Sequence, residues 1–148
     1  MNDYFYKMCR RELGKKEQNK FDFLKTSKLR EASKEVINKP GIYLIYTYTG
    51  RTKELVYIGK AGTMLKEKNF QRQKLMGRIN NTSHNKPRNK YFKEKMKKGN
   101  FDKLVFYWFV TYSDVLNSKK IVPAYLEAKL LQHFVNKKET LPKWNERF

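Results

Sequence analysis

The residue with the clearest potential for chemistry is Glu127, a carboxylate in the segment AYLEAKLL. Apolar spacing around it predicts a helix whose buried arc contains Leu126, Leu130, Leu131 and Phe134. Glu127 falls inside this arc, so its side chain is expected to point inward. A buried carboxylate is costly unless it is protonated, paired with a cation or bound to a metal ion. The sequence leaves two interpretations open, an ion pair with a Lys or Arg and a metal site.

Sulfur and imidazole ligands for a metal ion are scarce in this chain. Cys9 is the only cysteine, and neither His84 nor His133 has a second His or Cys at ligand spacing. A zinc site is therefore not expected, and a bound metal ion should take oxygen ligands. Cys9 is interpreted as an incidental free thiol.

Two tyrosine-containing tripeptides lie in strongly β-forming segments. GIYLIYTY begins with Gly41–Tyr43, and ELVYIG ends with Tyr57–Gly59. Both segments predict strands, and the turn sequence around Gly50 favours an antiparallel hairpin that brings Tyr43 and Tyr57 together. The two tripeptides, in this order, resemble the signature of the GIY-YIG nuclease family, and the resemblance covers about residues 40–147.

The resemblance extends to three further positions. The family carries an arginine on the first helix after YIG, often as L-x-x-R, and Leu75–Arg78 matches this pattern, with Arg72 as the competing choice. A metal-binding glutamate on a later helix corresponds to Glu127. An asparagine near the end of the domain corresponds to Asn145 in LPKWN.

These matches imply a metal-dependent endonuclease that hydrolyses DNA phosphodiesters. Tyr43 would be the general base on water, but a phenol near its ordinary pKa is a poor base at neutral pH. Positive charge, which Lys60 could supply, must therefore favour the phenolate. Tyr57 would hydrogen-bond the water or a phosphate oxygen, Arg78 would hold the scissile phosphate, and Glu127 would bind one Mg²⁺ or Mn²⁺ per active site. The structural alternatives are sheet aromatics for the tyrosines and a solvated charge for the arginine.

The chain departs from the family pattern in two places. Family members commonly have a Tyr or His one helical turn after the arginine, where this chain has Thr82; His84 or Tyr91 could fill that role. The 21 positions from Tyr57 to Arg78 exceed the spacing in the simplest members. Insertions here resemble the type II restriction endonuclease branch.

Charge predicts a polyanionic partner. The chain has 34 Lys and Arg against 14 Asp and Glu, a net charge of +20, together with 10 Phe, 10 Tyr and 2 Trp. This composition favours nucleic acid, most of all double-stranded DNA. Two basic segments, 66–74 and 86–98, are expected either to follow the DNA backbone or to form solvated surface. The residues assigned to DNA contacts are Lys66, Lys68, Arg72, Lys74, Lys86, Arg88, Lys90 and Lys93.

The sequence gives no indication of membrane insertion or export. No run approaches the roughly 20 apolar residues of a spanning helix, and residues 1–16 lack the apolar core of an export signal. A cytoplasmic location is therefore expected.

The remaining elements are predicted from periodicity and turn residues. In chain order they are a helix over 25–37, a loop over 60–70, a helix over 71–81, a helix over 89–98 with a left-handed cap at Gly99, a strand over 104–110, a helix over 123–136, and a tail packed through Leu141, Trp144 and Phe148. The fold class is thus mixed α/β, with a small three-stranded, mostly antiparallel sheet flanked by helices, as in GIY-YIG nucleases. Residues 1–39 are interpreted as a helical or irregular arm and 40–148 as the nuclease-like domain.

Three functions remain in competition. The first is a metal-dependent endonuclease, with a type II restriction enzyme suggested because no DNA-targeting domain is recognised beside the nuclease core. A homodimer would then be needed to cut both strands. The second is a repair or mobile-element nuclease acting on branched or nicked DNA. The third is a non-catalytic nucleic-acid-binding protein, which would have no use for the inward carboxylate of Glu127.

Overall fold

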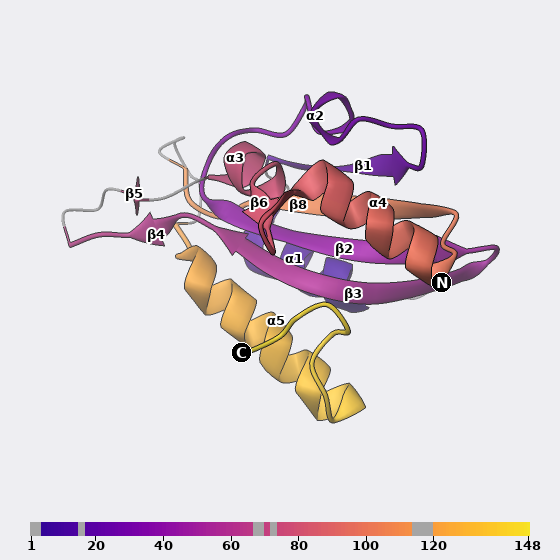
Figure 1. Ribbon diagram of the computed structural model, residues 1–148. Coiled ribbons are helices and arrows are strands. Elements are labelled where there is room, and N and C mark those ends of the chain that lie inside the picture. The colour runs from indigo at the N-terminus through magenta and orange to yellow at the C-terminus, as the bar shows by residue number, and fades with distance from the viewer. Residues whose placement is uncertain (1–3, 15–16, 67–69, 72–73, 114–119) are drawn as a thin grey trace.

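The computed structural model describes residues 4–14, 17–66, 70–71, 74–113 and 120–148. These residues form a mixed α+β fold, with a four-stranded antiparallel sheet and helices on both of its faces (Figure 1). The strands, in their order across the sheet, are β1 (Gln18–Leu24), β8 (Lys103–Val110), β2 (Gly41–Thr49) and β3 (Thr52–Ala61). None of the helices in the described ranges is long and apolar enough to cross a membrane.

The predicted hairpin of β2 and β3 is confirmed, with Gly50 at its turn in a left-handed conformation. The register places Tyr43 opposite Gly59 and Ile45 opposite Tyr57, so the two tyrosines are diagonal neighbours with ring centroids 5.7 Å apart. A Cβ atom at Gly59 would lie 2.6 Å from ring atoms of both tyrosines. Glycine is required there because a side chain would occupy the space of the Tyr43 phenol.

The expectation of a three-stranded sheet is wrong, because residues 18–24 form a fourth strand along β8. Two side chains of β1 attach it to the core: Phe23 is fully buried, and Phe21 stacks on Phe106 with ring centroids 4.6 Å apart. The other side chains of this edge strand are mostly exposed. The three apolar residues of these seven positions, Phe21, Phe23 and Leu24, give too short an alternation for the sequence to indicate a strand.

The N-terminal arm also contains two helices, α1 (Tyr4–Leu13) and α2 (Leu29–Ala32). The helix expected over 25–37 is therefore mostly wrong. Residues 25–28 form the turn after β1, in which the hydroxyl of Ser27 accepts the backbone N–H of Leu24. Side-chain bonding of this kind competes with helix formation.

One face of the sheet is covered by α2, α3 (Leu75–Ile79) and α4 (Arg88–Gly99). Helix α3 is shorter than the predicted 71–81. It is joined to α4 by a small hairpin of β6 (Thr82–Ser83) and β7 (Lys86–Pro87), which the sequence did not predict.

Two turns on this face contain residues with a left-handed backbone conformation. His84 and Asn85, with φ of 52° and 63°, form the turn between β6 and β7. The cap of α4 is Asn100 at φ 53° rather than Gly99, which corrects the expected position. Gly99 instead makes room for Phe101, whose ring would lie 2.1 Å from a Cβ atom at that position.

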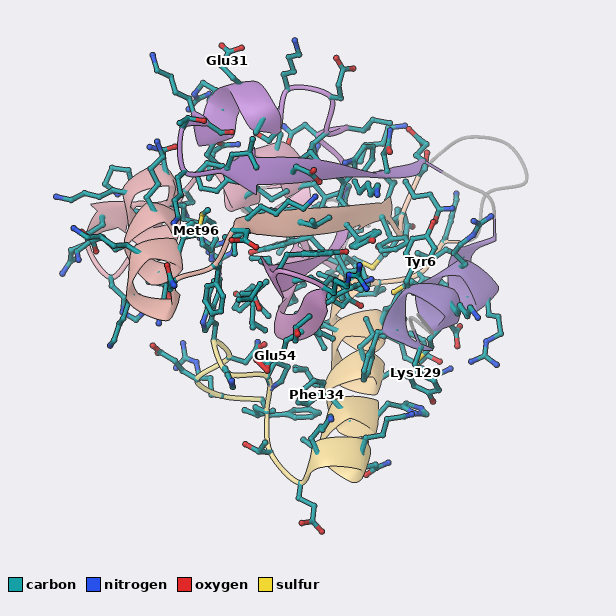
Figure 2. The ribbon with its side chains drawn as sticks, turned by 90° about the vertical axis from the view of Figure 1, so that its right-hand side faces the viewer. Tyr6, Glu31, Glu54, Met96, Lys129 and Phe134 are labelled. Carbon is teal, nitrogen blue, oxygen red and sulfur yellow. The ribbon has the colours of Figure 1, made fainter. Side chains whose placement is uncertain are left out.

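The opposite face is covered by α1 and by α5 (Pro123–Lys138), whose predicted apolar arc is buried. Figure 2 shows Met96 of α4 and Phe134 of α5 on opposite sides of the sheet. After α5 the chain follows the free edge of β3, where the backbone N–H of Trp144 donates to the carbonyl of Val56 at 2.8 Å. Phe148 is 64% exposed, so the expectation that it packs is wrong.

The segment predicted as a loop over 60–70 continues β3 and then forms a narrow ribbon of β4 (Thr63–Met64) and β5 (Phe70–Gln71). Figure 1 shows this ribbon extending beyond the main sheet. The ring of Phe70 packs on that of Tyr112, with centroids 4.7 Å apart. Because β4 follows β3 directly, the ribbon begins next to the end of β3 that carries Lys60.

Candidate functional site

A cavity of about 510 Å³ is lined by residues of β3, α3, the β6–β7 hairpin, α4, α5 and the C-terminal segment. An adjoining cavity of about 440 Å³ shares four of its lining residues, Tyr57, Lys60, Arg78 and Glu127. Six of the seven residues predicted as catalytic line the first cavity, namely Tyr57, Lys60, Arg78, His84, Glu127 and Asn145. The structure therefore brings together side chains that are up to 88 positions apart in sequence.

Tyr43, the seventh predicted residue, is fully buried and does not line either cavity. Its hydroxyl oxygen accepts a hydrogen bond of 2.6 Å from Nη1 of Arg88. Burial raises the pKa of Tyr43 well above its usual value, against the opposing positive charges of Arg88 and Arg78. Tyr43 therefore carries its proton at neutral pH, which makes it a poor base in this arrangement.

Arg88 occupies an unexpected position. It was assigned to DNA contacts at the surface, but it is only 5% exposed and lies at the start of α4, facing the cavity. Its Nε donates to Oγ of Ser83 at 2.8 Å. Its guanidinium carbon lies 5.9, 5.8 and 5.6 Å from the ring centroids of Tyr43, Tyr57 and Phe92. Burial disfavours the charged guanidinium, but the phenol oxygens of both tyrosines favour it and keep the pKa of Arg88 above its usual value.

One feature of the sequence could have indicated that Arg88 is buried. A cation in the first turn of a helix opposes the helix dipole, and Arg88 directly follows the Pro87 cap. Such a local conflict is expected mainly where a residue serves another purpose.

Glu127 projects from α5 into the space shared by both cavities, where it is half-buried. Burial raises the pKa of its carboxyl group, and the charges of Lys60 and Arg78 partly counter this effect. Glu127 forms no ion pair or hydrogen bond with the residues that the structure describes. The two cations therefore act on it across the cavity, and the direct ion pair left open by the sequence is not formed with any described Lys or Arg.

The residues fit one weakly held divalent ion. Among the described residues there is no group of three or more His, Cys, Asp or Glu that could enclose a metal ion. Mg²⁺ commonly uses only one or two protein carboxylates and completes its shell with water and substrate phosphate oxygens. Glu127 meets this requirement, whereas Lys60 and Arg78 would repel a cation until an anion neutralises them.

Both candidates for the missing Tyr or His lie at the cavity. The rings of His84 and Tyr91 stack with centroids 5.2 Å apart, and Thr82 lies on the same hairpin. Nε2 of His84 is 3.2 Å from a carboxylate oxygen of Glu146. This contact joins the β6–β7 hairpin to the C-terminal segment.

Asn145 uses both ends of its amide on the backbone of Ile58. The N–H of Ile58 donates to Oδ1, and Nδ2 donates to the carbonyl of Ile58, both at 2.9 Å. The side chain of Asn145 thus provides hydrogen-bond partners for the backbone at the free edge of β3, next to Tyr57. This geometry indicates a positioning role, and it leaves one amide N–H and one oxygen lone pair of Asn145 without a bond to Ile58.

The other cations assigned to DNA contacts are more peripheral than Arg88. Lys66, Lys74 and Lys90 are exposed, while Lys86 and Lys93 are partly exposed. Nζ of Lys86 forms an ion pair with Glu94 of α4. Lys68 and Arg72 lie outside the described residues.

The cavity combines the carboxylates of Glu127 and Glu146, several cations and the phenols of Tyr57 and Tyr91 in a space that a phosphate group could enter. Charge-assisted hydrogen bonds from guanidinium and ammonium groups suit a phosphodiester, and a carboxylate suits a hard cation. No protein-family model, curated protein or solved structure matches this chain.

Proposed function

We propose that this protein is a metal-dependent endonuclease that hydrolyses DNA phosphodiesters, as its resemblance to GIY-YIG nucleases implies. The observation that carries the proposal is the placement of Glu127, a half-buried carboxylate with no ion pair to the described residues, in one cavity with Tyr57, Lys60 and Arg78. A protein that only binds polyanions gains nothing from a carboxylate in the middle of its cationic surface. A phosphodiester hydrolase has a use for each of these groups.

Lys60 and Arg78 would hold the non-bridging oxygens of the scissile phosphate and offset the charge that develops on them. Glu127 would hold Mg²⁺ or Mn²⁺, which when bound supplies a Lewis acid for the phosphate and its leaving oxygen. The binding of phosphate would relieve the repulsion between the metal ion and the two cations. Metal ion and DNA are therefore expected to bind cooperatively.

Of the two tyrosines of the β2–β3 hairpin, Tyr57 is the one that can meet the attacking water, because it lines the cavity and Tyr43 does not. We assign to Tyr57 the hydrogen bond that orients this water. Tyr43 would position Arg88 through the hydrogen bond that it accepts from this residue. The general-base role that the resemblance implies for Tyr43 would require its hydroxyl to become accessible when DNA binds.

Double-stranded DNA is the proposed substrate because the net charge of +20 exceeds what a small ligand needs. One such site in each chain implies that two copies, or two successive nicks, are needed for a double-strand break. A restriction enzyme and a repair-like nuclease would share this chemistry and differ in the DNA that they select. We infer a cytoplasmic site of action for either.

The test is incubation of the protein with supercoiled plasmid DNA, with Mg²⁺ or Mn²⁺ and with EDTA. Wild-type protein should cleave only with the metal ion, and Glu127→Gln should lose at least about 100-fold in rate. Glu31→Gln provides the control, since Glu31 lies on α2 and points away from the molecule (Figure 2). Tight binding of DNA without any metal-dependent product would reject the proposal. Discrete fragments would favour a sequence-specific enzyme, and a relaxed circle a repair-like nuclease.

A further inference from the structure

Arg88 is a buried cation that has no carboxylate partner among the described residues. Its guanidinium donates hydrogen bonds to the hydroxyls of Ser83 and Tyr43, and the ring of Tyr57 lies 5.8 Å from its central carbon. Phe92 covers a further side of the guanidinium. All of these groups are neutral while the phenols carry their protons.

While the phenols carry their protons, this arrangement provides no negative charge to compensate the buried guanidinium. Buried charges are normally paired, because neutral acceptors replace only part of the hydration that the ion loses. An apolar side chain of similar length would fill similar space between the rings, and would remove the buried charge together with its hydrogen bonds to Tyr43 and Ser83. The open side of Arg88 is the cavity that it shares with Arg78 and Lys60.

We propose that Arg88 is a second phosphate-binding residue, whose missing counter-ion is the phosphate group that enters the cavity. The two hydroxyl partners occupy two of the five N–H groups that a guanidinium carries. The remaining N–H groups can donate to an anion in the cavity. Ser83 and Tyr43 hold the planar group in one orientation, which favours recognition of a tetrahedral oxyanion.

The identity of the anion as part of a DNA strand rests on the proposed nuclease function, but phosphate binding itself can be measured without DNA. The probe is inorganic phosphate, compared with chloride at equal ionic strength and pH 7.5, and the measurement is the melting temperature of the metal-free protein. Wild-type protein should melt at a higher temperature in phosphate, because ligand binding to the native state stabilises it.

The decisive variant is Arg88→Met, which replaces the cation by an apolar side chain of similar length. Its melting temperature in chloride should equal or exceed that of the wild type, while its response to phosphate should disappear. Arg88→Lys should keep the charge and lose the planar donors, with a phosphate affinity lower by about tenfold. Arg30→Met is the matched control, because Arg30 is an exposed arginine of α2 and should leave the response unchanged.

Two outcomes would overturn the proposal. An undiminished phosphate response in Arg88→Met would show that the anion binds elsewhere, and a lower melting temperature or failure to fold in chloride would make Arg88 a structural residue. Plasmid cleavage by the wild type is scored separately. If phosphate binding depends on Arg88 but no DNA is cut, only the nuclease proposal fails, and if DNA is cut without such dependence, only the role of Arg88 fails.

Discussion

Glu127 and Arg88 are charged residues of the cavity that are half-buried and buried, respectively, and neither has a direct partner of opposite sign among the described residues. Glu127 faces two cations across the cavity, and Arg88 contacts only hydroxyls and rings. Glu127 would gain a bound metal ion as its partner, and Arg88 would gain a phosphate group. Under our two proposals, the costs of both charges in the free protein have a common explanation, which is preorganisation for a metal ion and a phosphate group.

The raised pKa of Glu127 predicts how its effect on stability changes with pH. Burial, the main cause of the shift, favours the protonated form in the folded protein. The carboxyl group is therefore neutral in the folded and the unfolded protein at low pH, and it reduces stability once it ionises. In EDTA, Glu127→Gln should therefore have nearly wild-type stability at pH 4 and exceed it at pH 7.5. The measurement is urea unfolding at both pH values, with Glu31→Gln as the control. A stability difference that does not grow with pH would contradict the placement of the carboxyl group.

The two tyrosines of the β2–β3 hairpin should differ in what their hydroxyls contribute. Tyr43→Phe removes a buried acceptor from Arg88 and should cost about 1–3 kcal/mol in the free energy of unfolding. Tyr57→Phe should cost less stability, because Tyr57 is partly exposed, and should reduce cleavage at least as much. Denaturant unfolding and the cleavage rate of each variant measure the two effects. The opposite order in stability would mean that the hydrogen bond to Arg88 contributes little.

At the scale of elements, the site depends on how closely β2 and β3 approach each other at Gly59. A methyl group there would meet both phenol rings at 2.6 Å, and both rings are confined by the core and by Arg88. Gly59→Ala should therefore destabilise the protein by about 1–3 kcal/mol and displace both tyrosines. Cleavage should fall with it. Thr52→Ala, at the exposed start of β3, is the control in the same unfolding and cleavage assays, and equal effects of the two changes would argue against crowding at Gly59.

The elements that sequence analysis predicted correctly are the long and periodic ones. Helix α5 repeats its apolar residues over four turns, so the inward position of Glu127 could be predicted. Strands β2, β3 and β8 are dense in β-branched and aromatic residues. These elements already place Tyr57, Lys60 and Glu127 near one another.

The features that the sequence did not reveal depend on short elements and tertiary contacts. Strands β6 and β7 have two residues each, too few for any periodicity, and their hairpin is what turns Arg88 inward. The amide of Asn145 could be matched to a family position, but its pairing with the edge of β3 follows only from the path of the C-terminal segment. Strand β1 is attached by two phenylalanines, a signal too small to separate it from a loop.

For the molecule as a whole, the net charge of +20 predicts that DNA binding depends steeply on salt. Each phosphate neutralised by a Lys or Arg contributes about 0.9 to the slope of log K against log salt concentration, because bound counter-ions are released. Six phosphate contacts would give a slope near −5, or a loss of about 10³ in affinity between 50 and 200 mM salt. Fluorescence anisotropy of a labelled duplex, without divalent ions, measures this slope.

The slope also tests which surface meets the DNA. Lys90 and Lys93 of α4 lie beside the helix end that carries Arg88, so replacing both by Ala should reduce the slope by about 2. Replacing the exposed Lys25 and Lys28, in the turn between β1 and α2, removes the same charge from a different part of the surface and should leave the slope nearly unchanged. Equal losses from both pairs would mean that the chain binds DNA through its overall charge without a preferred face. A loss confined to α4 would orient the duplex along this helix, with one phosphate positioned to enter the cavity between Arg88 and Glu127.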